Sequence, residues 1–227
     1  LCREEFKKIF LEADGKLNLN SLNNFRNNVN TKAEILIDQN YISSSNSNLF
    51  NKLKSLDLVN LYHKYSNYVD LDILRMCSES KAGNNSCIIY RGQRISHRVL
   101  RYAYYVSQIQ KNTNLKFKSN NIVMDLGGGY GGLSRFLKNV YTDSTFVTIE
   151  LPEMCALATF FLKKCFPNKK IGTLSNFEKL DKISKDEIIK FDFVILPQPM
   201  MEKFEDETFD LSINTTSLGE MTDEMQQ

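Results

Sequence analysis

A cluster of glycines in the second half of the chain constrains the fold more than any other feature. Residues 123–132 read VMDLGGGYGG, so an apolar run containing one acid is followed by five glycines within six residues. Such clusters occur where a backbone turns with positive φ and lets a ligand approach its N–H groups. Apolar residues then recur at helical spacing over residues 133–140. The pattern predicts a strand, a cofactor loop and an amphipathic helix, which together make half of a Rossmann-type unit.

The spacing of the glycines fits two classes of cofactor. Gly127, Gly129 and Gly131 match the spacing of S-adenosylmethionine (SAM) sites, whereas Gly132 completes the spacing of dinucleotide sites. Asp125 favours SAM, because a carboxylate beside a helix N-terminus opposes a bound pyrophosphate but suits the ammonium and sulfonium groups of SAM. We therefore expect SAM as the cofactor, with NAD or NADP as the alternative.

A second strand is predicted about two dozen residues after Asp125, the distance expected in a nucleotide-binding fold. Residues 145–150 read TFVTIE, a β-branched and aromatic run that ends in Glu150. A carboxylate at this place can accept hydrogen bonds from both hydroxyls of a ribose. Pro152 and the apolar spacing after it predict a helix there, and Glu150 is also placed to cap that helix.

Two more strands are predicted at residues 191–196 (FDFVIL) and 209–214 (FDLSIN). Strands that alternate with helices or loops form a parallel sheet, so we expect an α/β fold with a Rossmann-like domain at residues 119–227. Residues 1–118 are expected to form an N-terminal helical region, or lid, with loops in its Asn- and Ser-rich stretches. Apolar spacing predicts helices there at residues 6–13, 49–62, 71–77 and 96–109.

Three segments, in order along the chain, resemble the sugar O-methyltransferases of bacterial polysaccharide and antibiotic gene clusters. They are DLGGGYGGL at 125–133, ELPE at 150–153 and DLSINTTSLGEM at 210–221. The resemblance covers residues 121–221 and implies a class I SAM-dependent methyltransferase. It also implies that the acceptor is a sugar hydroxyl, in a nucleotide sugar or a glycan, and that the product belongs to a surface polysaccharide or a glycosylated metabolite. Glu150 stands where Asp is commoner in that family, and a ribose contact remains possible with either acid.

The resemblance also implies site residues. The segment after the fourth strand is expected to line the reaction site, with Thr215 and Ser217 near the acceptor and Glu220 as the general base. His97 is the rival base, because its unperturbed pKa is the better suited to neutral pH. The residues expected to bind the cofactor are Asp125, Gly127, Gly128, Gly129, Tyr130, Gly131, Glu150, Leu151 and Asn214.

Basic residues gather before the predicted glycine loop. Arg94, Arg98 and Arg101 are spaced to share one face of a predicted helix, with His97 alongside. Cations at a helix start oppose the helix dipole, so a phosphate-bearing acceptor would compensate for them. We therefore expect Arg94 and Arg98 to bind the acceptor. The alternative is a solvated face whose charges pair with surface acids.

The composition argues against several functional classes. The net charge is +2 and no domain-wide block of Lys and Arg stands out, which disfavours nucleic acid as a partner. No apolar run approaches the roughly 20 residues that span a bilayer and no signal peptide opens the chain, so a cytoplasmic location is expected. Five cysteines without a C-x-x-C pair, together with two histidines, predict reduced thiols and no zinc site, whereas a Mg²⁺ ion held by carboxylates stays an alternative to the absence of any metal.

The number of predicted strands can be compared with that of a whole methyltransferase domain. A full class I methyltransferase sheet has seven strands and only four are predicted here, so we expect a fragment of a longer protein. The first residue, Leu1, favours the same interpretation. An exposed edge at the fourth strand would favour pairing with another chain, as in a homo-oligomer. A non-catalytic SAM-binding fragment or scaffold partner is therefore the main alternative to an enzyme.

Overall fold

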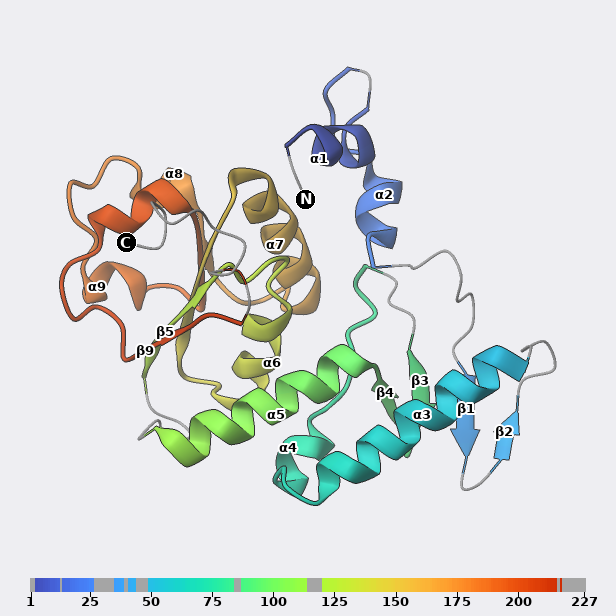
Figure 1. The fold of residues 1–227 in the computed structure, drawn as a ribbon. Coiled ribbons are helices and arrows are strands. Elements are labelled where there is room, and N and C mark those ends of the chain that lie inside the picture. Colours follow the sequence, from blue (N-terminus) through green and yellow to red (C-terminus); the bar gives the residue numbers. More distant parts are fainter. Residues whose placement is uncertain are drawn as a thin grey trace. The chain divides into compact units, whose positions relative to one another are not determined.

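The computed structural model describes residues 3–12, 14–26, 35–38, 41–43, 49–83, 87–113, 120–215 and 217. The chain divides into two compact units, whose elements are labelled in Figure 1. Residues 12–114 form the N-terminal unit, and residues 1–11 with 115–227 form the C-terminal unit. The boundary thus falls between residues 114 and 115, where the sequence suggested 118 and 119. None of the helices in these described stretches combines the length and the apolar composition needed to cross a bilayer.

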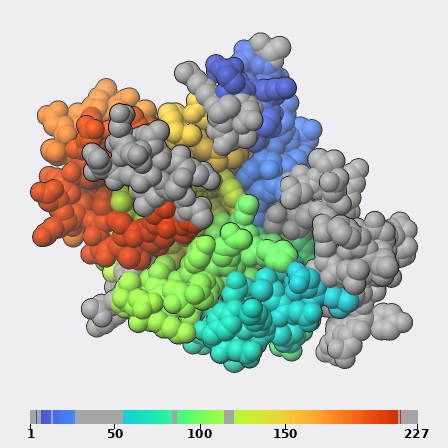
Figure 2. Space-filling view, in the orientation of Figure 1, coloured from blue at the N-terminus to red at the C-terminus, as the bar shows by residue number. Residues whose placement is uncertain are grey.

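The N-terminal unit contains a sheet as well as helices. Its strands follow the order β2-β1-β3-β4, and only β1 and β3 run parallel. The prediction of an N-terminal region of helices and loops therefore missed this sheet, because strands of three or four residues are too short to show a periodic pattern. Helix α5 lies beside α3 at the surface of the unit (Figure 2). The elements are α2 (Leu19–Asn24), β1 (Ile35–Asp38), β2 (Tyr41–Ser43), α3 (Leu49–Ser66), α4 (Leu71–Arg75), β3 (Ile88–Tyr90), β4 (Gln93–Ile95) and α5 (His97–Asn112).

The C-terminal unit is built on a parallel sheet of five strands in the order β7-β8-β6-β5-β9. A mixed α/β unit with a Rossmann-like parallel sheet is therefore confirmed. The two-residue strand β7 adds one strand to the four that the sequence predicts. The strands are β5 (Ile122–Leu126), β6 (Thr145–Glu150), β7 (Ile171–Gly172), β8 (Phe193–Pro197) and β9 (Leu211–Ile213), and helix α1 (Arg3–Phe10) belongs to the same unit.

Successive side chains of a strand point to opposite faces of the sheet. Helices cover both of these faces here. Met124, Val147 and Val194 belong to the core cluster on one face, which also contains side chains of α8 (Leu174–Phe177), α9 (Lys185–Ile188) and the 3₁₀ helix η1 (Gln198–Lys203). On the opposite face, α6 (Gly132–Val140) and α7 (Pro152–Cys165) cover the sheet, and Ser134 of α6 bonds to Thr148. The unit therefore has three layers, with helices on either side of the sheet (Figure 1).

The strand order reverses at β5. After β5 the chain forms β6, β7 and β8, which all lie on one side of β5, whereas β9 pairs with the other edge of β5. In open parallel sheets a ligand binds outside the carboxyl ends of the strands, at the point where the order reverses. That point lies at the ends of β5 and β9, and it positions the candidate site.

Candidate functional site

The glycine loop, residues 127–131, connects β5 to α6 at the reversal point (Figure 1). Gly127, Gly129 and Gly131 have φ angles of 72°, 59° and 81°. Residues that carry a side chain rarely adopt these left-handed backbone conformations, so the backbone requires glycine at these three positions. They are the three positions of the SAM spacing, whereas Gly132 is already the first residue of α6.

Neighbouring side chains also limit which residues can replace the loop glycines. A Cβ atom on Gly127 would lie 1.9 Å from Ser217 Oγ, and one on Gly128 would lie 2.6 Å from Asp125 Oδ2. At Gly129, by contrast, nothing in the described part of the chain lies within 4 Å of the Cβ position. A side chain at Gly127 or Gly128 would therefore collide with neighbouring protein atoms, whereas the space beside Gly129 is open.

Glu150 joins the end of β6 to the glycine loop. Its Oε1 accepts a hydrogen bond of 2.9 Å from the Gly129 N–H, and its Oε2 accepts one of 2.7 Å from the Leu151 N–H. The suggestion that Glu150 caps α7 is wrong, because Leu151 is the N-cap residue of this helix and no side chain makes the cap hydrogen bond. The bond to the loop was not foreseen. Each carboxylate oxygen has a second lone pair, so both can still accept hydrogen bonds from a ligand. Leu151 beside them is 44% exposed and offers an apolar surface.

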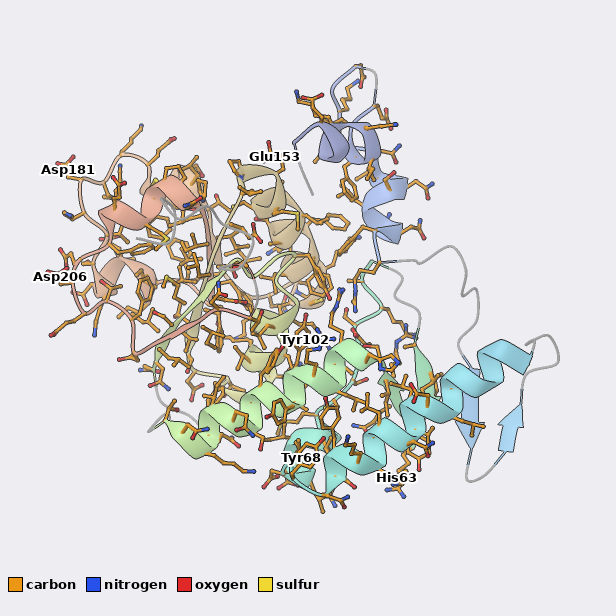
Figure 3. The ribbon with its side chains drawn as sticks, in the orientation of Figure 1. His63, Tyr68, Tyr102, Glu153, Asp181 and Asp206 are labelled. Carbon is orange, nitrogen blue, oxygen red and sulfur yellow. The ribbon has the colours of Figure 1, made fainter. Side chains whose placement is uncertain are left out.

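If the loop binds SAM as the sequence predicts, a Glu150→Gln variant is expected to weaken S-adenosylhomocysteine binding about tenfold. The amide keeps one acceptor oxygen but turns its NH₂ group toward one of the two backbone N–H donors, so one charge-assisted hydrogen bond is lost. Titration calorimetry measures the change. Glu153→Gln is the matched control, because it removes a carboxylate from the same sequence segment in the first turn of α7 (Figure 3). Equal weakening in both variants would contradict the role given to Glu150.

Asp125 lies beneath the loop and not on its open side. The side chain is 1% exposed, its Oδ2 accepts a 3.4 Å hydrogen bond from Ser134 Oγ, and its Oδ1 has no hydrogen-bond partner in the described part of the chain. Burial raises the pKa of Asp125 to about 7, the Ser134 hydrogen bond acts against that shift, and the charge of Glu150 adds to it. The sequence predicts a cofactor contact for Asp125, whereas the structure shows a carboxyl that supports Gly128 from below.

This burial predicts a pH-dependent stability. A pKa raised from the ordinary 3.8 to about 7 gives a contribution to the free energy of unfolding that is complete below 3.8 and lost as the pH rises through 7. Asp125→Asn should therefore gain several degrees of melting temperature over the parent between about pH 5 and about pH 8. Asp206→Asn, at an exposed position (Figure 3), is the control for removing a carboxylate without burial. A melting-temperature difference that does not change with pH would contradict the prediction.

The segment after β9 turns toward the start of the glycine loop. Asn214 Nδ2 and Ser217 Oγ both donate to the carbonyl oxygen of Leu126, over 2.9 Å and 3.0 Å. These residues were expected to contact cofactor and acceptor, and the structure brings both to the loop backbone. Thr215 between them is partly exposed. Glu220, the expected base, lies outside the described residues.

Two further loop residues contact the α7 helix. The Tyr130 ring stands edge-on to the Phe161 ring, with centroids 4.9 Å apart. Gly131 is the residue that caps α6, and a Cβ there would lie 3.0 Å from Leu162. Packing of α7 therefore also fixes the end of the loop.

The basic residues of the N-terminal unit do not share one helical face. Arg94 lies in β4, and α5 begins only at His97 because the Ser96 hydroxyl accepts a hydrogen bond from the Val99 N–H and caps the helix. The prediction is therefore wrong for Arg94, whereas Arg98 is an exposed residue of α5. The His97 side chain is 58% exposed, and its Nε2 lies 4.0 Å from an oxygen of Asp57.

No protein-family model matches the sequence, and no curated protein is significantly similar to it. Function is therefore argued from the geometry of the site. Across the described stretches, no three side chains of His, Cys, Asp or Glu come together as metal ligands would. Sequence reasoning missed Ser134 and Thr148, whose hydroxyls are hydrogen-bonded to each other with Ser134 also bonded to Asp125, and the Leu126 carbonyl, which accepts from Asn214.

Proposed function

We propose that the C-terminal unit binds SAM at the glycine loop and that the chain is a SAM-dependent O-methyltransferase of the sugar-modifying type. The observation that carries the proposal is the hydrogen bond between Glu150 and the Gly129 N–H. A dinucleotide needs the loop amides and the positive helix end for its pyrophosphate. Here a carboxylate already accepts from the central amide of the loop and would repel a phosphate. A cofactor with a cationic centre and no phosphate suits this arrangement.

The residues at the ends of β5 and β6 fit the parts of such a cofactor. The Glu150 oxygens can accept from the two ribose hydroxyls, and the exposed Leu151 side chain can cover a face of the adenine ring. The three left-handed glycines let the rest of the molecule approach the backbone closely. When bound, SAM supplies a methyl group on a positively charged sulfur.

The chemistry asks two things of the protein. The acceptor hydroxyl must approach the methyl carbon in line with the carbon–sulfur bond, which breaks as the new carbon–oxygen bond forms. The hydroxyl proton must pass to a base as its oxygen becomes bonded to carbon. We assign that base to Glu220, six residues after Asn214, with His97 as the alternative.

The acceptor is proposed to be a sugar, a nucleotide sugar or a glycan, and the reaction is proposed to take place in the cytoplasm. Within the C-terminal unit, Thr215, partly exposed beyond β9, is the residue proposed to contact it, and Arg98, exposed on α5 of the N-terminal unit, is proposed separately as a phosphate contact. An arginine would serve an acceptor that carries phosphate, because its guanidinium binds phosphate oxygens in pairs.

Titration calorimetry with S-adenosylhomocysteine, NAD and NADP tests the cofactor assignment. Binding of S-adenosylhomocysteine alone is the expected result, and binding of NAD or NADP alone would overturn the proposal in favour of an oxidoreductase. Transfer of a labelled methyl group from SAM to nucleotide sugars tests the activity. Cofactor binding without transfer to any sugar acceptor would point to a non-catalytic SAM-binding protein.

A further inference from the structure

The carbonyl group of Leu126 is the point at which β5 and β9 separate. The two strands pair in parallel register as far as Asp125 opposite Ile213. One residue further along, the backbone of β9 no longer continues as a strand, and the Asn214 side chain donates to the Leu126 carbonyl in its place. A side-chain amide therefore replaces the next bond of the sheet ladder at the ends of β5 and β9.

The peptide group between Leu126 and Gly127 is held from both sides. Its N–H donates to the Ile149 carbonyl of β6 over 2.8 Å. Its carbonyl oxygen accepts from Asn214 Nδ2 and from Ser217 Oγ, and these two atoms are themselves hydrogen-bonded at 2.5 Å. A carbonyl oxygen has two lone pairs, so both donors can be satisfied at once. This peptide group is the first of the glycine loop, and its orientation sets the path of the loop.

Ser217 also occupies the space of a missing side chain. A Cβ atom on Gly127 would lie 1.9 Å from Ser217 Oγ and 2.3 Å from Ser217 Cβ. Gly127 therefore lacks a side chain for two reasons, its φ of 72° and the serine that lies against it. Together with this contact, the hydrogen bond from Ser217 to the Leu126 carbonyl joins residues 91 positions apart in the sequence.

We propose that Asn214 and Ser217 form a clasp on the Leu126 carbonyl, which positions the glycine loop and couples cofactor binding to the order of the segment that follows β9. Both are positioning residues that act through the loop backbone and not through direct contact with the acceptor. The coupling to the cofactor rests on the proposed function. The clasp itself rests only on the hydrogen bonds and the close contact at Gly127.

Hydrogen exchange without any ligand tests the clasp. In an Asn214→Ala/Ser217→Ala variant, amides of residues 126–131 should exchange about tenfold faster than in the parent, because the loop opens more often. The core strand β6 should keep its exchange rate. Ser212→Ala, at an exposed position of β9, is the matched control and should leave the loop unchanged. If the double variant does not fold, Ser217→Ala alone removes one donor and is expected to show a smaller acceleration. Unchanged exchange in the loop would overturn the clasp.

The same exchange experiment with S-adenosylhomocysteine tests the coupling. In the parent, the ligand should slow exchange in residues 126–131 and in residues 211–217 together. In the double variant it should bind about tenfold more weakly and protect only the loop. Equal protection of both segments in parent and variant would overturn the coupling. A parent that binds no S-adenosylhomocysteine would overturn the proposed function, and the ligand-free exchange would still decide the clasp.

A rescue experiment tests the close contact. Gly127→Ala should reduce S-adenosylhomocysteine affinity at least about tenfold, since the new methyl group displaces Ser217. Ser217→Gly removes the obstructing side chain but also the clasp hydroxyl, so Ser217→Gly alone is the reference. Gly127→Ala should cost less affinity in the Ser217→Gly background than in the parent, although the positive φ remains unfavourable for alanine. An equal cost in both backgrounds would show that the contact between residues 127 and 217 does not position the loop.

Discussion

A Gly129→Val variant is expected to lose S-adenosylhomocysteine affinity by at least about a hundredfold. Gly129 has a φ of 59°, which a β-branched residue adopts only with strain. Its Cβ position is open, with nothing in the described chain within 4 Å, so the valine methyl groups would occupy the side from which a ligand approaches. A shift of the backbone to relieve the strain would break the hydrogen bond from the Gly129 N–H to Glu150. Titration calorimetry gives the affinity, and thermal unfolding gives the change in stability.

Gly92→Val is the matched control for this variant. Gly92 has a φ of 76° and likewise nothing within 4 Å of its Cβ position, but it lies in the turn between β3 and β4 of the N-terminal unit. The two substitutions therefore strain the backbone in the same way at different places. Loss of binding in Gly129→Val alone supports a cofactor site at the loop. A Gly129→Val variant that binds as tightly as the parent would show that the cofactor site lies elsewhere.

A Glu220→Gln variant is expected to lower kcat by roughly a hundredfold, the typical effect of losing a general base. The glutamine side chain has nearly the same shape but cannot take the proton from the acceptor hydroxyl. Affinity for S-adenosylhomocysteine should stay unchanged, because the role is in proton transfer and not in cofactor binding. Turnover is measured as transfer of a labelled methyl group from SAM, with the cofactor at a saturating concentration.

His97→Ala decides between the two candidate bases. His97 is the first residue of α5 and is largely exposed beside Asp57. If His97→Ala abolishes turnover while Glu220→Gln retains nearly all of it, the base is His97. Loss in Glu220→Gln alone supports the assignment made here.

The sequence predicts the core of the C-terminal unit well, because its elements are long and strongly patterned. β5 and β6 are apolar runs buried on both faces, and α6 follows the glycine loop at clear helical spacing. The strand β7 has only two residues, and β1 to β4 have three or four, so their existence depends on partners far along the chain. Local pattern cannot show such pairings.

The same limit applies to the site. The positive φ angles of the three loop glycines could be predicted, because they depend on the tight turn of the local backbone and not on distant residues. The bonds of Asn214 and Ser217 to Leu126 join residues 88 and 91 positions apart, and nothing in the local sequence indicates which carbonyl they reach. Arg94 was placed on a helix because the prediction used only the spacing of the charged residues. Ser96 is the N-cap residue of α5, so the helix begins after Arg94, which lies in β4.

The position of Asp125 has a consequence for how the site would distinguish substrate from product. This buried carboxyl lies against Gly128, next in the chain to Gly129, whose Cβ position is open in the described part of the protein. Since its pKa is raised to about 7 by burial, the negative charge beneath the loop is present on the alkaline side of neutrality and absent on the acid side. A sulfonium ion gains from that charge and the neutral thioether left after transfer does not. If the site binds SAM as proposed, its preference for the sulfonium form over the neutral thioether would therefore rise with pH.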